Sequence, residues 1–175
     1  MGKGGAVTAR VAGYLNALSE ERARTALQRC CGARHWVDGM LAARPFASDA
    51  ELLAAAERVW WRLGRVDWLE AFATHPRIGA RGEGEGEAMP DWARREQAGA
   101  DGASEATLAA LAQENRAYEE RFGHVFLICA TGRTADEMLG ALRGRLTNDP
   151  ATELRVAAEE QAKITRLRLD KLVVS

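Results

Sequence analysis

The sequence predicts an all-α fold, a single-domain bundle of about eight helices. Apolar residues recur at helical spacing through most of the chain, which is rich in Ala, Leu, Glu and Arg and has few β-branched runs. Residues that cap helices precede several of these stretches. The 175 residues, 47% of them hydrophobic, suit one domain with a sizeable core. We therefore expect one domain over residues 1–175, with a flexible N-terminus over residues 1–10.

Serines mark the helix starts in the first half of the chain. Ser19 precedes "EERARTALQRC" and predicts an N-cap with acidic residues in the first turn. Ser48 and Glu51 have the spacing of a capping box. The helix that they begin carries one apolar stripe, formed by Leu52, Ala56, Val59, Trp60 and Leu63. The stretch "RVDWLEAFA" then predicts a short helix whose inward side chains are Trp68, Leu69 and Phe72.

Three further helices are predicted in the second half. Thr134 precedes "ADEMLGALRGRL" as a possible N-cap. Asp149 and Pro150 supply an N-cap and a proline at the first helical position of a helix that runs to about Leu172. The stretch "TLAALAQENRAYEERF" places four apolar side chains on one face: Leu108, Leu111, Tyr118 and Phe122.

Two stretches depart from the helical pattern. "HVFLICA" (124–130) is short, apolar and partly β-branched, so it fits either a lone extended segment or the start of a buried helix. "GARGEGEGE" (79–87) is of low complexity and predicts a surface loop with no identifiable ligand site.

Composition excludes several classes of function. The net charge of −1 and the absence of a dominant basic patch argue against nucleic acid as a partner. No apolar run approaches the roughly 20 residues of a membrane span, and the N-terminus does not read as a signal peptide. We expect a cytoplasmic protein that does not bind membranes. Its cysteines, Cys30, Cys31 and Cys129, predict reduced thiols rather than a disulfide framework.

His75 is the first candidate for chemistry. It stands directly before Pro76 in "THPRIG", and a residue before proline is pushed out of the helical region. His75 should therefore end the preceding helix and project beside a loop. This placement suits a catalytic acid or base, and it suits equally a histidine that caps the helix C-terminus.

Glu96 and Arg168 each allow two interpretations. Glu96 lies in "DWARREQAG", where the polar run Arg94 to Gln97 normally forms a solvated helix face, although a short helix beside a loop is also a common place for a site. Arg168 ends a stripe in the last helix formed by Leu154, Ala157, Gln161, Ile164 and Arg168. Such an arginine either extends to water or holds a carboxylate in a pocket.

Motifs for bound cofactors are absent from the sequence. The chain has no HxxxH, HExxH or CxxC spacing for a metal, no GxGxxG or Walker loop, and no GxSxG nucleophile elbow. We therefore expect no metal, and the residues that remain for chemistry are an acid/base histidine, a glutamate and an arginine.

Taken together, these segments resemble the family of 2-oxo-4-hydroxy-4-carboxy-5-ureidoimidazoline (OHCU) decarboxylases of urate degradation. The resemblance extends from about residue 16 to about residue 172, and the order and spacing of its motifs make it specific. The motifs that carry it are "RPF" (44–46), "AFATHPRIG" (71–79), "REQAGA" (95–100), "RFGHVFLICATGRTADEML" (121–139), "RLTND" (145–149) and "AAEEQAKITRLRL" (157–169).

The resemblance implies a cofactor-free enzyme, usually a homodimer, that decarboxylates OHCU to (S)-allantoin. It assigns the catalytic roles to His75, Glu96 and Arg168. It also implies that ten further residues contact the substrate: Pro76, Ala93, Arg94, Arg95, Gln97, Phe126, Leu127, Ile128, Cys129 and Ala130. The last five form the apolar segment and would make their contacts through backbone groups.

Two positions differ from the family pattern. Ala93 stands where many members carry a serine three residues before the glutamate, so one hydroxyl contact to substrate is either lost or supplied by water. His124-Val125 replaces a common Phe-Pro pair, and His124 is therefore interpreted as a packing or rim residue.

Two other functions remain open from the sequence. The same three side chains could serve a cofactor-free hydrolase or isomerase of another ureide. Alternatively, the five tryptophans could form the partner surface of a non-enzymatic helical module, although the helix stripes assign Trp60 and Trp68 to the core.

Overall fold

The computed structural model describes residues 10–79, 96, 98–100 and 102–173. The regular secondary structure of these residues consists of α-helices and a 3₁₀ segment, with no strand. The all-α prediction is confirmed. The chain divides into two compact units. Residues 1–71 and 162–175 form the first unit, and residues 72–161 form the second. Residues 1–9 of the predicted N-terminal segment lie outside the described residues, and Arg10 is the first residue of α1. The prediction of one domain over the whole chain stays a prediction.

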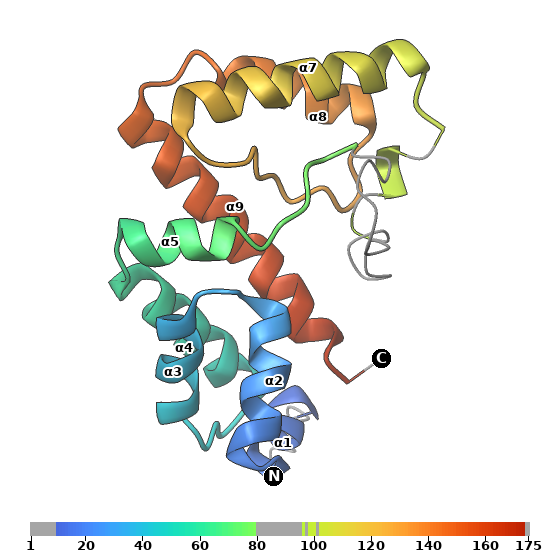
Figure 1. Cartoon of the computed structure of the whole chain (residues 1–175). Coiled ribbons are helices and arrows are strands. Elements are labelled where there is room, and N and C mark those ends of the chain that lie inside the picture. Colours follow the sequence, from blue (N-terminus) through green and yellow to red (C-terminus); the bar gives the residue numbers. More distant parts are fainter. Residues whose placement is uncertain (1–9, 80–95, 97, 101, 174–175) are drawn as a thin grey trace, which may run out of the picture. The chain divides into compact units, whose positions relative to one another are not determined.

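The first unit contains four complete helices: α1 (Arg10–Ala17), α2 (Glu20–Cys30), α3 (Arg34–Ala42) and α4 (Asp49–Arg62). It also holds most of α5 (Arg65–Phe72) and the last part of α9 (Pro150–Lys171). Helix α3 packs against both α2 and α4, and α1 packs against α4 (Figure 1). The largest fully buried side chains of this unit are Trp36, Leu15, Leu27, Met40, Leu52 and Leu169.

Caps predicted from the sequence are present in the first unit. Ser19 accepts the N–H of Arg22 at 3.4 Å and starts α2. Ser48 accepts the N–H of Glu51 at 3.1 Å, whereas the Glu51 carboxylate reaches the N–H of Ala47 rather than that of the N-cap itself. Helices α1 and α3 were not individually predicted. Helix α1 begins where the Asp49 carboxylate accepts three consecutive backbone N–H groups, so its cap comes from a distant residue.

Three tryptophans of the first unit, Trp60, Trp61 and Trp68, pack their rings together. The ring of Trp68 lies 6.0 Å from Trp60 and 5.8 Å from Trp61. Trp36 and Trp60 are buried, and for Trp60 the apolar stripe predicted this. Trp68, which was also predicted to face the core, is only half-buried. Trp92 lies outside the described residues. Two of the tryptophans thus serve the core rather than an exposed partner surface.

The second unit contains α7 (Glu105–Phe122), α8 (Ala135–Arg145) and residues 150–161 of α9, with a short 3₁₀ turn, Ala98–Ala100, before α7. Helices α7 and α8 lie side by side (Figure 1). Thr134 forms a complete capping box with Glu137 at the start of α8, and Asp149 accepts the N–H groups of Ala151 and Thr152 at the start of α9. The predicted caps at both helices are confirmed.

Residues 124–130, "HVFLICA", form neither a helix nor a strand. Helix α7 ends at Gly123, whose φ of 75° is the left-handed conformation that glycine adopts without strain. The chain then runs through the core of the second unit, where Phe126, Leu127 and Ile128 are buried. Of the two alternatives from the sequence, the start of a buried helix is therefore not observed, because residues 124–130 lie outside every described helix.

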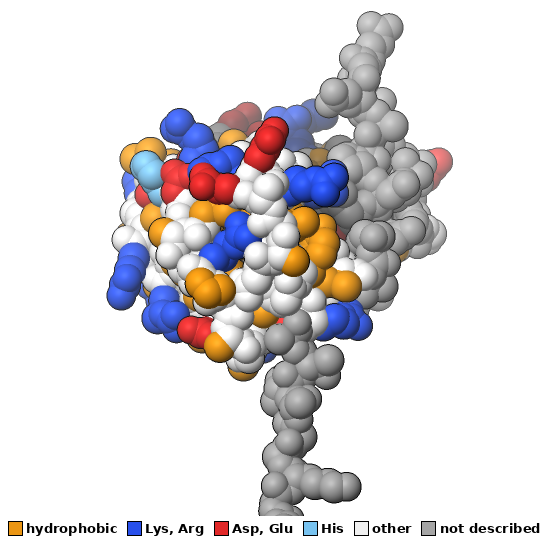
Figure 2. All heavy atoms as spheres, turned by 90° about the horizontal axis from the view of Figure 1, so that it is seen from below, with side chains coloured by type: hydrophobic (Ala, Val, Ile, Leu, Met, Phe, Trp, Pro, Cys, Tyr) orange, Lys and Arg blue, Asp and Glu red, His pale blue; other side chains and the backbone are white. Residues whose placement is uncertain are grey.

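On the face drawn in Figure 2, basic and acidic side chains are interspersed with apolar ones. None of the described helices has the length and apolar content to cross a membrane.

Candidate active site

His75 lies in the bend that follows α5. The helix ends at Phe72, and the His75 N–H donates to the Phe72 carbonyl at 3.1 Å. The sequence placed the end of this helix at His75, three residues too far along the chain. His75 itself lies outside the helix, as expected for a residue directly before a proline. His75 and Pro76 are both half-buried, so the imidazole is partly shielded from water.

The loop after His75 is fastened to α7. Arg77 makes a bidentate ion pair with Glu119 at 2.6 and 2.7 Å, and this contact holds the pKa of the Glu119 carboxyl below its ordinary value. The buried Asn115 amide donates to the Ile78 carbonyl at 3.2 Å. Gly79 has a φ of 75°, which allows the chain to turn there. These contacts fix the direction in which His75 projects.

The imidazole of His75 meets a side chain of α9. Its Nε2 atom lies 2.7 Å from the Oε1 atom of Gln161, which is fully buried. An amide oxygen only accepts hydrogen bonds, so this contact places a proton on Nε2. In the neutral ring, Nδ1 is then the basic nitrogen. The contact therefore fixes the orientation of the histidine ring.

The apolar segment 126–130 is held from α9 as well. The Cys129 N–H donates to the Glu160 carboxylate at 2.7 Å, and Glu160 is the residue directly before Gln161. The side chains of Phe126, Leu127, Ile128 and Ala130 are buried, and that of Cys129 is half-buried. With most of these side chains in the core, mainly backbone groups remain for a ligand to contact, and the substrate contacts of this segment stay a prediction.

His124 is part of an aromatic cluster. Its ring lies 5.2 Å from that of Phe72, 5.5 Å from that of Tyr118 and 6.3 Å from that of Phe122. This environment supports the prediction that His124 is a packing residue.

Glu96 is described as a helical, half-buried residue. Three residues later, Gly99 passes so close to the Arg133 carbonyl that a Cβ atom on Gly99 would lie 1.7 Å from that oxygen. Glycine is therefore required where the segment after Glu96 meets the loop before α8. The predicted contact residues Ala93, Arg94, Arg95 and Gln97, and the glycine- and glutamate-rich stretch 80–87, lie outside the described residues.

Arg168 belongs to the first unit, where it is half-buried near the C-terminus of α2. Its Nη1 atom donates to the Arg29 carbonyl at 3.4 Å. A cation is favoured there because the last carbonyls of a helix carry partial negative charge. The neighbouring Cys31 thiol is buried, and this burial raises its pKa to about 11. Cys30 and Cys31 are buried core residues that form no disulfide with the described cysteines, as predicted.

Four polar residues of the second unit were not assigned a role from the sequence: Gln161, Glu160, Glu153 and Arg145. All four are at most 9% exposed. A signal was present in α9, because Gln161 interrupts an apolar stripe and Glu153 and Glu160 are seven residues apart, a spacing that returns to the same helix face. Propensity alone could not distinguish buried glutamates from solvated ones.

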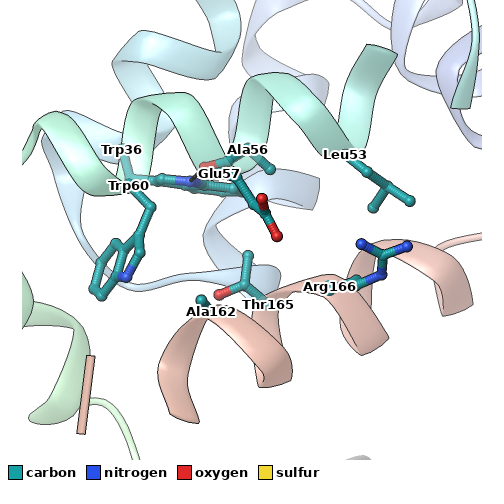
Figure 3. Close-up of a pocket in the computed structure, with 8 residues that line it drawn as sticks. All are labelled: Trp36, Leu53, Ala56, Glu57, Trp60, Ala162, Thr165 and Arg166. Carbon is teal, nitrogen blue, oxygen red and sulfur yellow. Dashed lines mark hydrogen bonds between the residues drawn. The ribbon is translucent and has the colours of Figure 1, made fainter. Parts of the chain in front are cut away.

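A small cavity in the first unit does not extend the site. It has a volume of about 10 Å³, and Figure 3 shows Glu57 and Thr165 pointing into it beside Trp36. Such a volume accommodates about one water molecule and no substrate. Across the described residues, no group of three or more His, Cys, Asp or Glu side chains is placed to hold a metal ion.

Comparison with known proteins gives one consistent result. The family model described as OHCU decarboxylase matches residues 16–170. The chain is 43% identical to the uric acid degradation bifunctional protein TTL of Arabidopsis thaliana, over 82% of this chain and 45% of that protein. It is 34% identical to the 2-oxo-4-hydroxy-4-carboxy-5-ureidoimidazoline decarboxylase of Amia calva, over 74% of this chain and 75% of that protein.

A solved structure has a similar fold. The crystal structure of OHCU decarboxylase in the presence of (S)-allantoin is 36% identical, with a TM-score of 0.74, over 90% of this chain and all of that chain. The helical fold and these relatives place the chain in the class of all-helical proteins related to OHCU decarboxylases. It belongs to the OHCU decarboxylase family. The chain spans less than half the length of the Arabidopsis bifunctional protein.

Proposed function

We propose that this chain decarboxylates OHCU to (S)-allantoin and CO2 in urate degradation, without a cofactor. Family membership supports the reaction, and the relatives named for uric acid degradation support the pathway. The observation that carries the proposal within the molecule is His75, a partly buried imidazole whose Nε2 is held at 2.7 Å by Gln161. A histidine fixed in this way is prepared to move a proton at Nδ1.

The chemistry of the substrate explains why so few groups suffice. The quaternary carbon of OHCU bears a hydroxyl and a carboxylate and adjoins a ring imine. When the carbon–carboxylate bond breaks, CO2 leaves and the electron pair forms a C=C bond to the imine carbon, while the π pair of the C=N bond moves to the nitrogen, which takes a proton. The former imine carbon then takes a proton, and the hydroxyl loses its own to become a carbonyl. The substrate is thus its own electron sink, and the protein supplies positioning, charge and the proton.

We assign the roles as follows. His75 is the acid/base, and delivery of its proton to one face of the ring sets the (S) configuration. Glu96 orients the substrate's ureido N–H groups or the imidazole. Arg168, seven residues after Gln161 in the sequence of α9, binds a substrate oxygen or carboxylate through its planar guanidinium. The last two assignments rest on the resemblance at their positions.

The substrate is also expected to meet the peptide groups of Phe126 to Ala130, with Pro76 beside the imidazole. Ala93, Arg94, Arg95 and Gln97 complete the proposed contacts. We further propose that the protein is a cytoplasmic homodimer, as the resemblance implies. Light scattering on the purified chain of 19.0 kDa would test the dimer by its doubled mass.

The decisive experiment follows the chirality of the product. Urate oxidase and hydroxyisourate hydrolase generate OHCU in situ, and circular dichroism records (S)-allantoin, because spontaneous decay gives a racemate. The parent protein should produce a chiral signal, and His75→Asn should reduce its rate by at least about a hundredfold. The matched control is His35→Asn, since His35 is largely exposed and pairs with Asp67 in the first unit.

Two results would contradict the proposal. A parent protein that produces no chiral allantoin lacks the activity. If His75→Asn forms (S)-allantoin at the parent rate, the acid/base is another residue. Evolution of CO2, measured in the same reaction, separates the decarboxylase from a hydrolase or isomerase of another ureide.

A further inference from the structure

The segment 126–130 has an unusual way of satisfying its backbone. It is buried but belongs to no helix or strand, so its peptide groups need other partners. Two of them meet charged side chains: the Leu127 carbonyl accepts from Nη1 of Arg145 at 2.6 Å, and the Cys129 N–H donates to Glu160 at 2.7 Å. Between them, the N–H and carbonyl of Ile128 take part in no hydrogen bond with the described residues.

Arg145 is itself held in a fixed orientation. Its Nε and Nη2 atoms donate to one oxygen of Glu153, at 2.8 and 2.5 Å, and the other oxygen accepts from the Asn148 amide at 2.9 Å. The Tyr118 hydroxyl also donates to Glu153. Burial and this carboxylate raise the pKa of the Tyr118 hydroxyl above its usual range, so the hydroxyl stays protonated and continues to donate.

The guanidinium is enclosed by rings as well. It lies 4.7 Å from the centre of the Phe126 ring and 5.9 Å from that of Tyr118. Both Arg145 and Glu160 are below 10% exposure, and burying charged groups is costly unless their hydrogen bonds are complete. A helix or strand could have satisfied this segment at lower cost. Either would also have used the Ile128 peptide groups.

We propose that Arg145 and Glu160 are positioning residues that fix the backbone of residues 126–130, so that the peptide groups of Ile128 are available to bind the substrate. This inference rests on the proposed decarboxylation of OHCU. The two residues touch the backbone and not the substrate. They act on substrate binding, whereas His75 acts on proton transfer.

Glu160 offers the sharper test, because its carboxylate accepts the Cys129 N–H directly. Glu160→Gln keeps an acceptor oxygen for the Cys129 N–H, and Glu160→Ala removes it. Glu159→Ala is the matched control, since Glu159 is the preceding residue on α9 and its partner is the surface residue Arg155. We expect Glu160→Gln and Glu159→Ala to stay within about threefold of the parent kcat/KM. Glu160→Ala should lose about tenfold or more, mainly through a higher KM.

The split between KM and kcat identifies the role. A folded Glu160→Ala protein with the parent KM would overturn the proposal, whatever its kcat. If Glu160→Ala does not fold, Glu160→Asp takes its place, because the shorter side chain withdraws the acceptor and keeps the charge. Arg145→Lys is an independent arm, since lysine cannot donate in a planar fork to Glu153 and Leu127 together, and it should raise KM as well.

Amide hydrogen exchange separates this proposal from the proposed function. It is measured by NMR on the protein without substrate, so it does not depend on activity. Exchange at the Cys129 N–H should accelerate at least about tenfold in Glu160→Ala relative to Glu160→Gln. Equal exchange in the two variants would refute the positioning role. A parent protein that makes no chiral allantoin but shows the exchange difference would refute only the proposed reaction.

Discussion

The Nε2 atom of His75 lies 2.7 Å from the Oε1 atom of Gln161, and Glu160, one residue earlier on α9, accepts the Cys129 N–H at 2.7 Å. Two consecutive residues of one helix thus hold the candidate acid/base and the candidate binding segment. They do so by opposite means, because Gln161 offers a neutral amide to a side chain and Glu160 offers a charge to the backbone.

Replacing Gln161 should change the behaviour of His75 without unfolding the protein. Gln161→Leu removes the acceptor from Nε2, and we expect kcat to fall about tenfold with a smaller change in KM. Gln161→Glu puts a negative charge beside the imidazole, and this charge stabilises the protonated ring. The acidic limb of its pH–rate profile should therefore move to higher pH.

Initial rates of chiral allantoin formation over a range of pH would measure both effects. Gln113→Leu, an exposed change on α7, is the control and should leave the profile unaltered. A Gln161→Leu protein with the parent kcat would mean that this contact does not orient a catalytic group.

Gly99→Ala should disturb the segment that follows Glu96. The added Cβ atom would lie 1.7 Å from the Arg133 carbonyl oxygen, and a backbone atom cannot move aside cheaply. We expect a loss of about 1–3 kcal/mol of unfolding free energy, together with reduced activity. Urea denaturation and initial rates measure the two effects. Gly140→Ala is the control, because nothing lies within 4 Å of its Cβ position and alanine favours the interior of α8.

The control should be neutral or stabilising by up to about 1 kcal/mol. If Gly99→Ala proved as stable and active as the parent, the close approach to Arg133 would not constrain this loop.

Glu153→Gln should be among the most destabilising single changes in the second unit. It removes the charge that neutralises Arg145, and Arg145 would remain buried without a counter-ion. The expected cost is about 3–5 kcal/mol of unfolding free energy, measured by urea denaturation. Glu159→Gln breaks only the exposed pair with Arg155 and should cost less than about 0.5 kcal/mol. Similar costs for the two variants would show that the buried pair contributes no more than a surface pair.

Cys31 should make the protein less stable in alkaline solution. Burial raises the pKa of the folded thiol from 9.0 to about 11, so the unfolded chain ionises first as the pH rises. The contribution to stability is complete below pH 9.0 and is lost as the pH rises toward about 11. The loss should be on the order of 2 kcal/mol.

Denaturation at several pH values would measure this slope, which should disappear in Cys31→Ala and persist in Cys30→Ala. The comparison of slopes removes the contribution of the other groups that titrate in this range. An identical slope in the parent and in Cys31→Ala would mean that the thiol is not the group responsible.

The sequence predicted most of the helices because their signals are local. Ser19, Ser48, Thr134 and Asp149 accept backbone N–H groups a few residues away, and Gly123 ends α7 in a conformation that glycine tolerates. The start of α1 was missed, because its cap is the carboxylate of Asp49, 37 to 39 residues further along the chain. The end of α5 was misplaced by three residues, since Pro76 restricts the chain without stating where the helix ends.

The sequence by itself determined the helical class, the caps and the candidate residues His75, Glu96 and Arg168, since periodicity, capping and motif order are properties of the linear chain. Only the tertiary structure decided that Gln161 meets His75, that Glu160 and Arg145 hold residues 126–130, and that Glu153 is a buried charge rather than a solvated one. The physical reason is that a polar side chain in a helix has the same propensity whether it faces water or a backbone group in the core. The partner of such a side chain is fixed only when the segments pack together. In the pairs His75–Gln161, Cys129–Glu160 and Leu127–Arg145, the two partners lie 18 to 86 residues apart in the sequence.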